Sequence, residues 1–322
     1  MTFVRTVLGD IAPATMGVTY AHEHLVIVGG KPVEISPDFL LADVDRMSAE
    51  LSDAAEVGLR TAVDAMPADC GRDPSKLAEL SRRSGVQIVA ATGLHHEKFY
   101  GPWHWSRRAT EDELADLFVA DVEEGIDSRD YSGPIVDRTP FRAGIIKIAG
   151  SEGGPSDRDV PIFRAAAAAH RRTGVPVHTH CEAGTGALEQ IRVLTDAGVP
   201  AERISLSHVD KVQDRGYHRE LLATGASAVY DQAFRWGDRE NGTLDLLEAA
   251  VADDRAGQVM LGMDAARQGY YRAFGGAPGL RYLLTSFSDE VDARGIGPEI
   301  RRRFFVDNPA RAFAFTEVID ES

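Results

Sequence analysis

The stretch VTYAHEHLVIV, residues 18–28, has the apolar composition of a buried strand, yet it carries two histidines and a glutamate. Side chains alternate between the two faces of a strand, so His22 and His24 point to the same face and Glu23 points to the other. This spacing differs from the helical HExxH motif of zinc proteases, whose histidines lie one turn apart. A histidine on an apolar strand is more often a hydrogen-bonded core residue than a metal ligand, and the rest of the chain has to decide between these roles.

Seven further strand-like runs follow this one, and amphipathic helical patterns alternate with them along the chain. The predicted strands cover 18–26, 59–65, 86–92, 143–149, 175–180, 203–208, 226–231 and 258–264. The predicted helices cover 43–57, 74–84, 111–124, 160–173, 186–197, 214–224, 243–255 and 278–294, with a final helix near 298–313. This alternation predicts an α/β fold, a (β/α)8 TIM barrel with an N-terminal extension and a C-terminal helix, and a doubly wound open sheet is the alternative.

The length and composition are compatible with one barrel. A single domain over residues 1–322 is expected, because barrels of about 250 residues and more form one domain. The net charge of −15 argues against nucleic acid or an anionic membrane as a partner, since both require a basic face. The start MTFVRTVLGD lacks the apolar run of a secretory signal, so we expect a cytoplasmic protein with Cys70 and Cys181 as reduced thiols.

Polar residues stand where the predicted strands end, which is where barrels of this type carry their catalytic groups. Each such residue in a hydrophobic strand must find a partner, or its burial costs on the order of 2–7 kcal/mol. A buried ammonium costs still more, so the lysine inside GIIKIAG, 144–150, is the most informative of them. Besides the histidine pair of the first strand, these residues are Asp64, Lys147, His180, His208 and Asp264.

Three interpretations of Lys147 follow from its burial. It could pair with a carboxylate inside the barrel, or it could form a Schiff base as an amine whose pKa is lowered. It could also react with carbon dioxide and give a carbamate, an anionic ligand that bridges two metal ions. The imidazoles and the aspartate at the neighbouring strand ends favour the carbamate, because a Schiff-base aldolase has no need of them.

The series of motifs resembles the phosphotriesterase family of the amidohydrolase superfamily. The residues that carry this resemblance are GVTYAHEHL (17–25), IIKIAG (145–150), VHTHCEAG (177–184), LSHVDK (206–211) and LGMDAAR (261–267), and the match continues to VDNPARAFAF (306–315). The resemblance implies two divalent metal ions, zinc by default, although cobalt, manganese or iron would suit the same ligands. It assigns His22, His24 and Asp264 to the more buried ion and His180 and His208 to the more exposed one, with carboxylated Lys147 and a hydroxide bridging the two.

Such a centre implies metal-assisted hydrolysis of an ester. The bridging hydroxide attacks a carbonyl or phosphoryl group that a metal ion polarises, and Asp264 accepts the proton and passes it to the leaving group or to solvent. His178 lies on the same face as His180 but matches no ligand of the family, and it is interpreted as a substrate contact or an outer residue of the metal site, or equally as a core residue.

Arginines follow the last two strands and indicate an anionic substrate. Arg235, Arg239, Arg267 and Arg272 reverse the sign of an acidic protein locally, and guanidinium groups bind phosphate or carboxylate oxygens. Some of them could instead pair with Asp231, Asp238 or Glu240 on a solvated surface.

The stretch ARQGYYRAFGGAPG, 266–279, resembles one branch of the family, the lactonases that open sugar lactones, phosphorylated ones included. The branch implies that Arg267 and Tyr270 hold a phosphate and that a basic residue near Arg235 assists, and Tyr100 and Lys211 are further expected substrate contacts. The segment HHEKFYGPWHW, 95–105, contains FY and HW pairs like those of the same branch and is expected to form an ordered lid.

We therefore predict a binuclear metal-dependent lactonase that acts on a small polar, anionic sugar lactone. The alternatives are a phosphotriesterase or acyl-homoserine lactonase, a non-catalytic ligand-binding member of the family, and a Schiff-base aldolase that uses Lys147. The resemblance also implies a homodimer.

Overall fold

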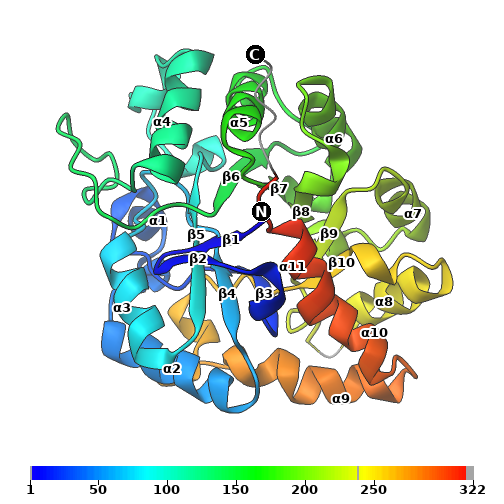
Figure 1. Ribbon diagram of the computed structural model, residues 1–322. Helices are drawn as coiled ribbons and strands as arrows, with labels where there is room; N and C mark the ends of the chain where they lie inside the picture. The colour runs from blue at the N-terminus through cyan, green and yellow to red at the C-terminus, as the bar shows by residue number, and fades with distance from the viewer. Residues whose placement is uncertain (1, 238, 317–322) are drawn as a thin grey trace.

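Eight parallel strands form a barrel in the computed structural model, which describes residues 2–237 and 239–316 (Figure 1). Each strand is hydrogen-bonded to its neighbour in chain order. The barrel closes just beyond the last strand, where the backbone N–H of Asp264 donates to the carbonyl of His22 at 2.9 Å. The predicted TIM barrel is thus confirmed over an open sheet. Its strands are β3 (Thr19–Glu23), β4 (Thr61–Asp64), β5 (Gln87–Thr92), β6 (Ile145–Gly150), β7 (Val177–Cys181), β8 (Ile204–Ser207), β9 (Ser227–Tyr230) and β10 (Val259–Leu261).

Helices surround the strands (Figure 1). Capping residues set the starts of several helices. Asp43 and Asp73 accept hydrogen bonds from the first turns of α2 (Val44–Glu56) and α3 (Pro74–Ser84). Thr110 forms a reciprocal capping pair with Glu113 at the start of α4 (Glu111–Glu123). The short helix α1 (Gly30–Ile35) follows β3 and was not predicted. The predicted helices are α2 (Val44–Glu56), α3 (Pro74–Ser84), α4 (Glu111–Glu123), α5 (Asp159–Thr173), α6 (Ala187–Asp196), α7 (Arg215–Ala223), α8 (Gly242–Ala252) and α9 (Ser286–Ala293).

The prediction was wrong at the start of α9, which begins at Ser286 and not at 278. The preceding residues belong to the loop after β10, and Leu280–Leu284 forms only a 3-10 turn. Glu50 of α2 explains this, because its carboxylate accepts hydrogen bonds from the backbone N–H groups of Ala273 and Leu280, both at 2.8 Å. The loop is thereby held against α2 instead of continuing as a helix.

The N-terminal extension and the C-terminal helix close the end of the barrel at which the strands begin. The extension forms a hairpin of β1 (Val4–Thr6) and β2 (Gly9–Ile11). The final helix is broken into α10 (Pro298–Arg302), a π-helical turn over Arg303–Asp307, and α11 (Asn308–Ala312). Val4 and Phe313 pack into one buried cluster with Val63, Val89 and Met260 of the strands, so that this half of the barrel is a solid apolar core.

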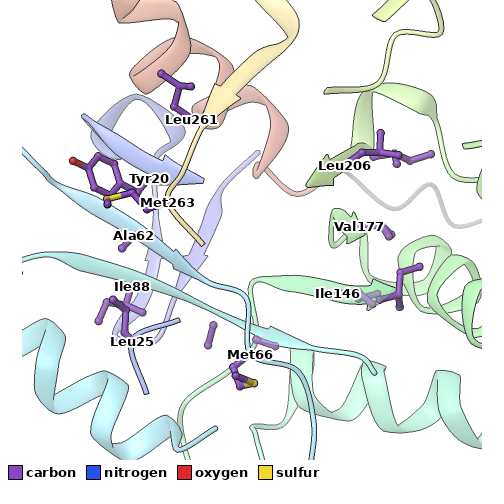
Figure 2. Packing of buried hydrophobic residues seen from close by; sticks show 14 of the residues in the cluster. Tyr20, Leu25, Ala62, Met66, Ile88, Ile146, Val177, Leu206, Leu261 and Met263 are labelled. Atoms are coloured by element: carbon purple, nitrogen blue, oxygen red, sulfur yellow. The ribbon is translucent and has the colours of Figure 1, made fainter. Parts of the chain in front are cut away.

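A second apolar layer lies between the strands and the helices, and strands from all around the barrel contribute to it, with Ile88, Ile146, Leu206 and Leu261 among their side chains (Figure 2). Polar side chains collect at the C-terminal end of the barrel, opposite the cluster that contains Val4 and Phe313. No helix in the described part of the chain is both long enough and apolar enough to span a membrane.

Candidate metal centre and active site

A pocket of about 280 Å³ opens at the C-terminal end of the barrel. The five predicted histidine and aspartate ligands come from the ends of β3, β7 and β8 and from the loop that follows β10. Lys147 of β6 lies beneath them, with only 1% of its surface exposed. The pocket thus brings together what the sequence predicted at separate strand ends: His22, His24, His180, His208 and Asp264 all line it.

His22, His24 and Asp264 form the deeper part of this cluster. The Nε2 atoms of His22 and His24 lie 3.7 and 3.3 Å from the same Asp264 oxygen, Oδ1. Among the described residues, the buried Nε2 of His22 has no hydrogen-bond partner. A buried polar atom without a partner is costly, and a divalent ion between these three side chains would satisfy it. The donor set therefore fits a metal ion.

Glu23 positions Asp264, which accounts for the third polar residue of the AHEH sequence. Its carboxylate accepts the backbone N–H groups of Met263 at 2.8 Å and of Ala265 at 3.2 Å, one on each side of Asp264. Asp264 itself has a φ of 47°, in the left-handed region that non-glycine residues rarely occupy. The two hydrogen bonds from the flanking backbone to Glu23 keep Asp264 in this strained conformation.

Asp231, which directly follows β9, links two of the histidines through hydrogen bonds. It accepts hydrogen bonds from Nδ1 of His22 at 3.1 Å and from Nδ1 of His208 at 2.9 Å. Burial alone would raise the Asp231 pKa, but His208 and the two imidazole hydrogen bonds hold it well below the usual range. The carboxylate thus keeps the proton of each ring on Nδ1, and the Nε2 lone pairs are left for a metal ion.

The second pair of ligands lies nearer the pocket opening. The rings of His180 and His208 have centroids 4.4 Å apart, and Nε2 of His180 lies 2.7 Å from the Glu182 carboxylate. Burial lowers the pKa of both histidines, and it lowers that of His22 to about 3. The imidazoles are therefore neutral near pH 7, which is the form that binds metal ions.

Lys147 has no charged partner in the described part of the chain, because none of the ion pairs there includes it. Its Nζ donates to the Ser207 hydroxyl at 3.2 Å. Burial lowers the pKa of Lys147 to about 8, although the nearby Asp264 carboxylate opposes this. The interpretation that this lysine pairs with a carboxylate is therefore wrong for the described residues, and the lowered pKa makes the neutral amine more abundant near physiological pH than it is in an exposed lysine.

Several cationic side chains line the pocket. The lining includes four of the residues that were predicted as substrate contacts, Lys211, Arg235, Arg267 and Tyr270. Arg235 donates to the carbonyl of Asp264 at 2.6 Å and lies 3.4 Å from its carboxylate. Arg267 lies over the ring of Phe39 at 4.2 Å, and 38% of its side chain is exposed. The guanidinium of Arg267 also donates to the Ser36 hydroxyl at 3.2 Å and lies 3.9 Å from the Asp38 carboxylate, and the side chain lines the pocket.

Two other predicted arginines do not reach this pocket. Arg239 lies over the ring of Trp236 at 5.2 Å, and Arg272 approaches Asp53 of α2 at 3.9 Å. The suggested partner Asp238 lies outside the described residues. Of the arginines after β9 and β10 that the sequence singled out, Arg235 and Arg267 are thus the ones that face the site.

Comparison with known proteins agrees with this geometry. The sequence model of the phosphotriesterase family matches residues 2–313. The chain belongs to this family. It is 33% identical to a phospho-furanose lactonase from Mycoplasmopsis agalactiae, over 98% of this chain and 92% of that protein.

Two solved structures extend the comparison to the fold. An amidohydrolase from Mycoplasma synoviae has a TM-score of 0.96 and 31% identity, covering 100% of this chain and 94% of that one. A lactonase from Listeria monocytogenes has a TM-score of 0.90 and 33% identity, covering 98% and 100% respectively. The expected family is therefore confirmed, and relatives from its lactonase branch are among the most similar proteins.

Two predicted substrate contacts lie elsewhere. His178 is one layer deeper in the barrel than His180: its Nδ1 is 2.8 Å from the Ser205 hydroxyl and its ring is 5.0 Å from that of His22. Tyr100 is turned away from the pocket, and its hydroxyl donates to the carbonyl of Ala68 at 2.8 Å. Neither side chain lines the pocket, so both assignments to substrate binding are corrected to supporting roles.

The sequence reasoning missed His95, which does line the pocket. Tyr100 holds it in place, because the Tyr100 hydroxyl accepts the backbone N–H of His95 at 2.8 Å. The Nδ1 atom of His95 accepts the backbone N–H of His96 at 2.6 Å, so the neutral ring carries its proton on Nε2. The adjacent histidines His95 and His96 in the predicted lid were the only sequence signal for this hydrogen-bond donor in the pocket.

Proposed function

We propose that this protein is a metal-dependent lactonase that opens a phosphorylated sugar lactone. The observation that carries the proposal is the meeting of Lys211, Arg235 and Arg267 with the histidine cluster in one pocket of an acidic protein. Lys211 and Arg267 would bind a phosphate while the ester lies over the ligand cluster, and Arg235 adds positive charge beside Asp264. The phospho-furanose lactonase relative supports the same substrate class.

We propose further that two divalent ions, zinc by default, occupy the cluster. His22, His24 and Asp264 would hold one ion, His180 and His208 the other, and Lys147 would bridge them as a carbamate. Support comes from the neutral imidazoles and from the amine of Lys147, which has no ion pair with a described residue and can therefore react with carbon dioxide, forming an N–C bond and releasing a proton. When bound, the ions would supply an ionised water and polarise the ester oxygen.

The remaining steps depend on side chains of the protein. Asp264, which lines the pocket, would accept a proton and deliver it to the ring oxygen of the lactone, which leaves as a hydroxyl group. Arg235 keeps this carboxylate oriented through its contacts with Asp264, and Arg267 would hold the phosphate at a distance from the reacting carbon. Both oxygens of the ester stay in one product, an open-chain hydroxy acid.

A second candidate substrate is a neutral lactone with an acyl chain, such as an acyl-homoserine lactone. Apolar side chains in the same pocket favour it, because Phe39, Met66 and Phe99 would contact such a chain. The cationic side chains of the pocket favour the phosphorylated substrate. A comparison of the two substrate classes with one enzyme preparation therefore tests the proposal directly.

The test is a panel of phosphorylated sugar lactones, γ-butyrolactone, an acyl-homoserine lactone and paraoxon. We expect the highest kcat/KM for a phosphorylated lactone. Arg267→Ala should raise KM for that substrate by roughly thirtyfold, the equivalent of one charged hydrogen bond of about 2 kcal/mol, and should leave neutral lactones unchanged. Arg272→Ala is the matched control, since this arginine of the same loop faces Asp53. Equal or higher kcat/KM on the neutral esters would refute the proposal.

The homodimer stays a prediction. Among the described residues Trp103 of the lid is 90% exposed and Ile135 is 62% exposed, so apolar surface is available for an interface. Sedimentation equilibrium would measure the mass in solution, and a monomer at micromolar concentration would contradict this prediction.

A further inference from the structure

Glu182 lies between the proposed metal centre and the lid. It follows β7, two residues after His180, and its side chain is 30% exposed. One of its oxygens, Oε2, lies 2.7 Å from Nε2 of His180. Both of its oxygens lie 3.0 Å from Nζ of Lys98, which belongs to the lid loop, residues 93–110, and lines the pocket. A single carboxylate therefore contacts a candidate ligand and the lid.

The hydrogen bond of Glu182 determines which nitrogen of His180 can bind a metal ion. An ionised carboxylate only accepts, so Nε2 of His180 must carry the proton and donate. The lone pair of the neutral ring is then on Nδ1. The opposite arrangement holds for His22 and His208, whose Nδ1 atoms face Asp231. The two carboxylates thus select different ring nitrogens in different histidines.

We propose that Glu182 is a positioning residue, which fixes His180 as an Nδ1 ligand of the more exposed ion and joins this ligand to the lid through Lys98. The inference rests on the proposed metal centre and adds a link between metal binding and the lid. An ion bound to the ring of His180 also fixes the position of Glu182, because the ring donates a hydrogen bond to this carboxylate. Glu182 in turn fixes the position of Lys98 through their ion pair. Because coupling between two binding events is reciprocal, an ordered lid also strengthens binding of that ion.

The lid has other ion pairs that do not touch His180, and they supply a matched control. Glu97, next to Lys98, pairs with Arg158 at 2.8 Å and with Arg107 at 3.2 Å. Glu97→Gln should therefore loosen the lid without removing the acceptor of His180. A difference between changes at positions 97 and 182 separates ligand positioning from simple loss of lid contacts.

The experiment is a stepwise zinc titration of the metal-free protein by equilibrium dialysis, combined with hydrogen exchange of the lid loop. We expect Glu182→Ala to weaken the second binding step 10- to 100-fold, about the range for loss of an outer carboxylate, and to leave the first step unchanged. Glu182→Gln retains an acceptor oxygen and should restore most of that affinity. In Glu182→Ala, Glu182→Gln and Lys98→Met, zinc should no longer slow exchange in the lid loop. Glu97→Gln should weaken the second binding step far less than Glu182→Ala does, and zinc should still slow exchange in the lid loop.

Unchanged zinc affinity in Glu182→Ala would overturn this inference and leave the proposed lactonase standing. Equal loss in Glu182→Gln and Glu182→Ala would overturn it as well, since Glu182 would then be a direct metal ligand. Fewer than two zinc ions in the unaltered protein would refute the metal centre itself, together with the inference. The lactone panel measures the proposed function separately, so the two failures are distinguishable.

Discussion

Replacing Asp231 tests whether one buried carboxylate prepares one histidine of each proposed ion site. Asp231 is fully buried and accepts hydrogen bonds from the Nδ1 atoms of His22 and His208. In Asp231→Ala neither Nδ1–H has an acceptor, and each ring is free to move its proton to Nε2, the nitrogen that would face the ion. In Asp231→Asn the remaining amide oxygen can occupy the position of Oδ2, which lies within reach of both rings.

The expected magnitude follows from these contacts. Loss of the outer partner of a metal-binding imidazole costs about 10- to 100-fold in affinity, or roughly 1.4–2.8 kcal/mol. Because Asp231 serves one histidine of each site, both binding steps should weaken by this amount in Asp231→Ala. The exposed surface of His22 is 1%, so water is not expected to replace the missing acceptor fully. Asp231→Asn should lose about tenfold or less per step.

Zinc titration by equilibrium dialysis measures both steps, with far-UV circular dichroism to confirm that each variant is folded. Asp121→Asn is the control, because Asp121 is an equally buried carboxylate that instead accepts from Arg72 at 2.8 Å and Thr92 at 2.7 Å. This control should lose stability while the folded protein keeps its zinc affinity. Zinc affinities in folded Asp231→Ala within twofold of those of the unaltered protein would refute the reasoning.

Three further predictions concern Lys147 and His95. Lys147→Met removes the proposed carbamate, so elemental analysis should find at most one ion per chain, and two retained ions would contradict the bridge. Burial lowers the pKa of Lys147 from 10.5 to about 8, so between these two pH values the lysine binds more protons in the unfolded chain than in the folded protein. The unfolding free energy of the metal-free protein should therefore rise with pH in this range. Urea titrations at several pH values should show a smaller rise in Lys147→Met. His95→Phe should lower kcat for the lactone about tenfold at unchanged metal content, which is the equivalent of one hydrogen bond of roughly 1.4 kcal/mol. His95→Gln should restore part of the lost kcat, because its amide can still donate a hydrogen bond. Equal rates in the two variants would contradict the role of His95 as a hydrogen-bond donor.

Much of the fold was predictable because its signals are local. Strand ends, helix caps such as Asp73 and Thr110, and glycines after helices such as Gly85 depend on neighbouring residues, and the structure has the strands close to the predicted positions. The start of α9 was not predictable in this way. It depends on Glu50, a residue of α2 far away in the sequence, whose carboxylate binds the backbone of the loop after β10.

The sequence by itself determined the barrel and the group of residues that gather at its C-terminal end, because parallel strands end at the same edge and alternate side chains share a face. Only the tertiary structure decided their depth and their partners. It placed His178 a layer below His180, turned Tyr100 away from the pocket, and brought His95 into it. Lys98 and Glu182 meet across 84 positions of the chain, and no local pattern encodes such a contact, since it exists only when the folded barrel brings the loop after β5 beside the loop after β7.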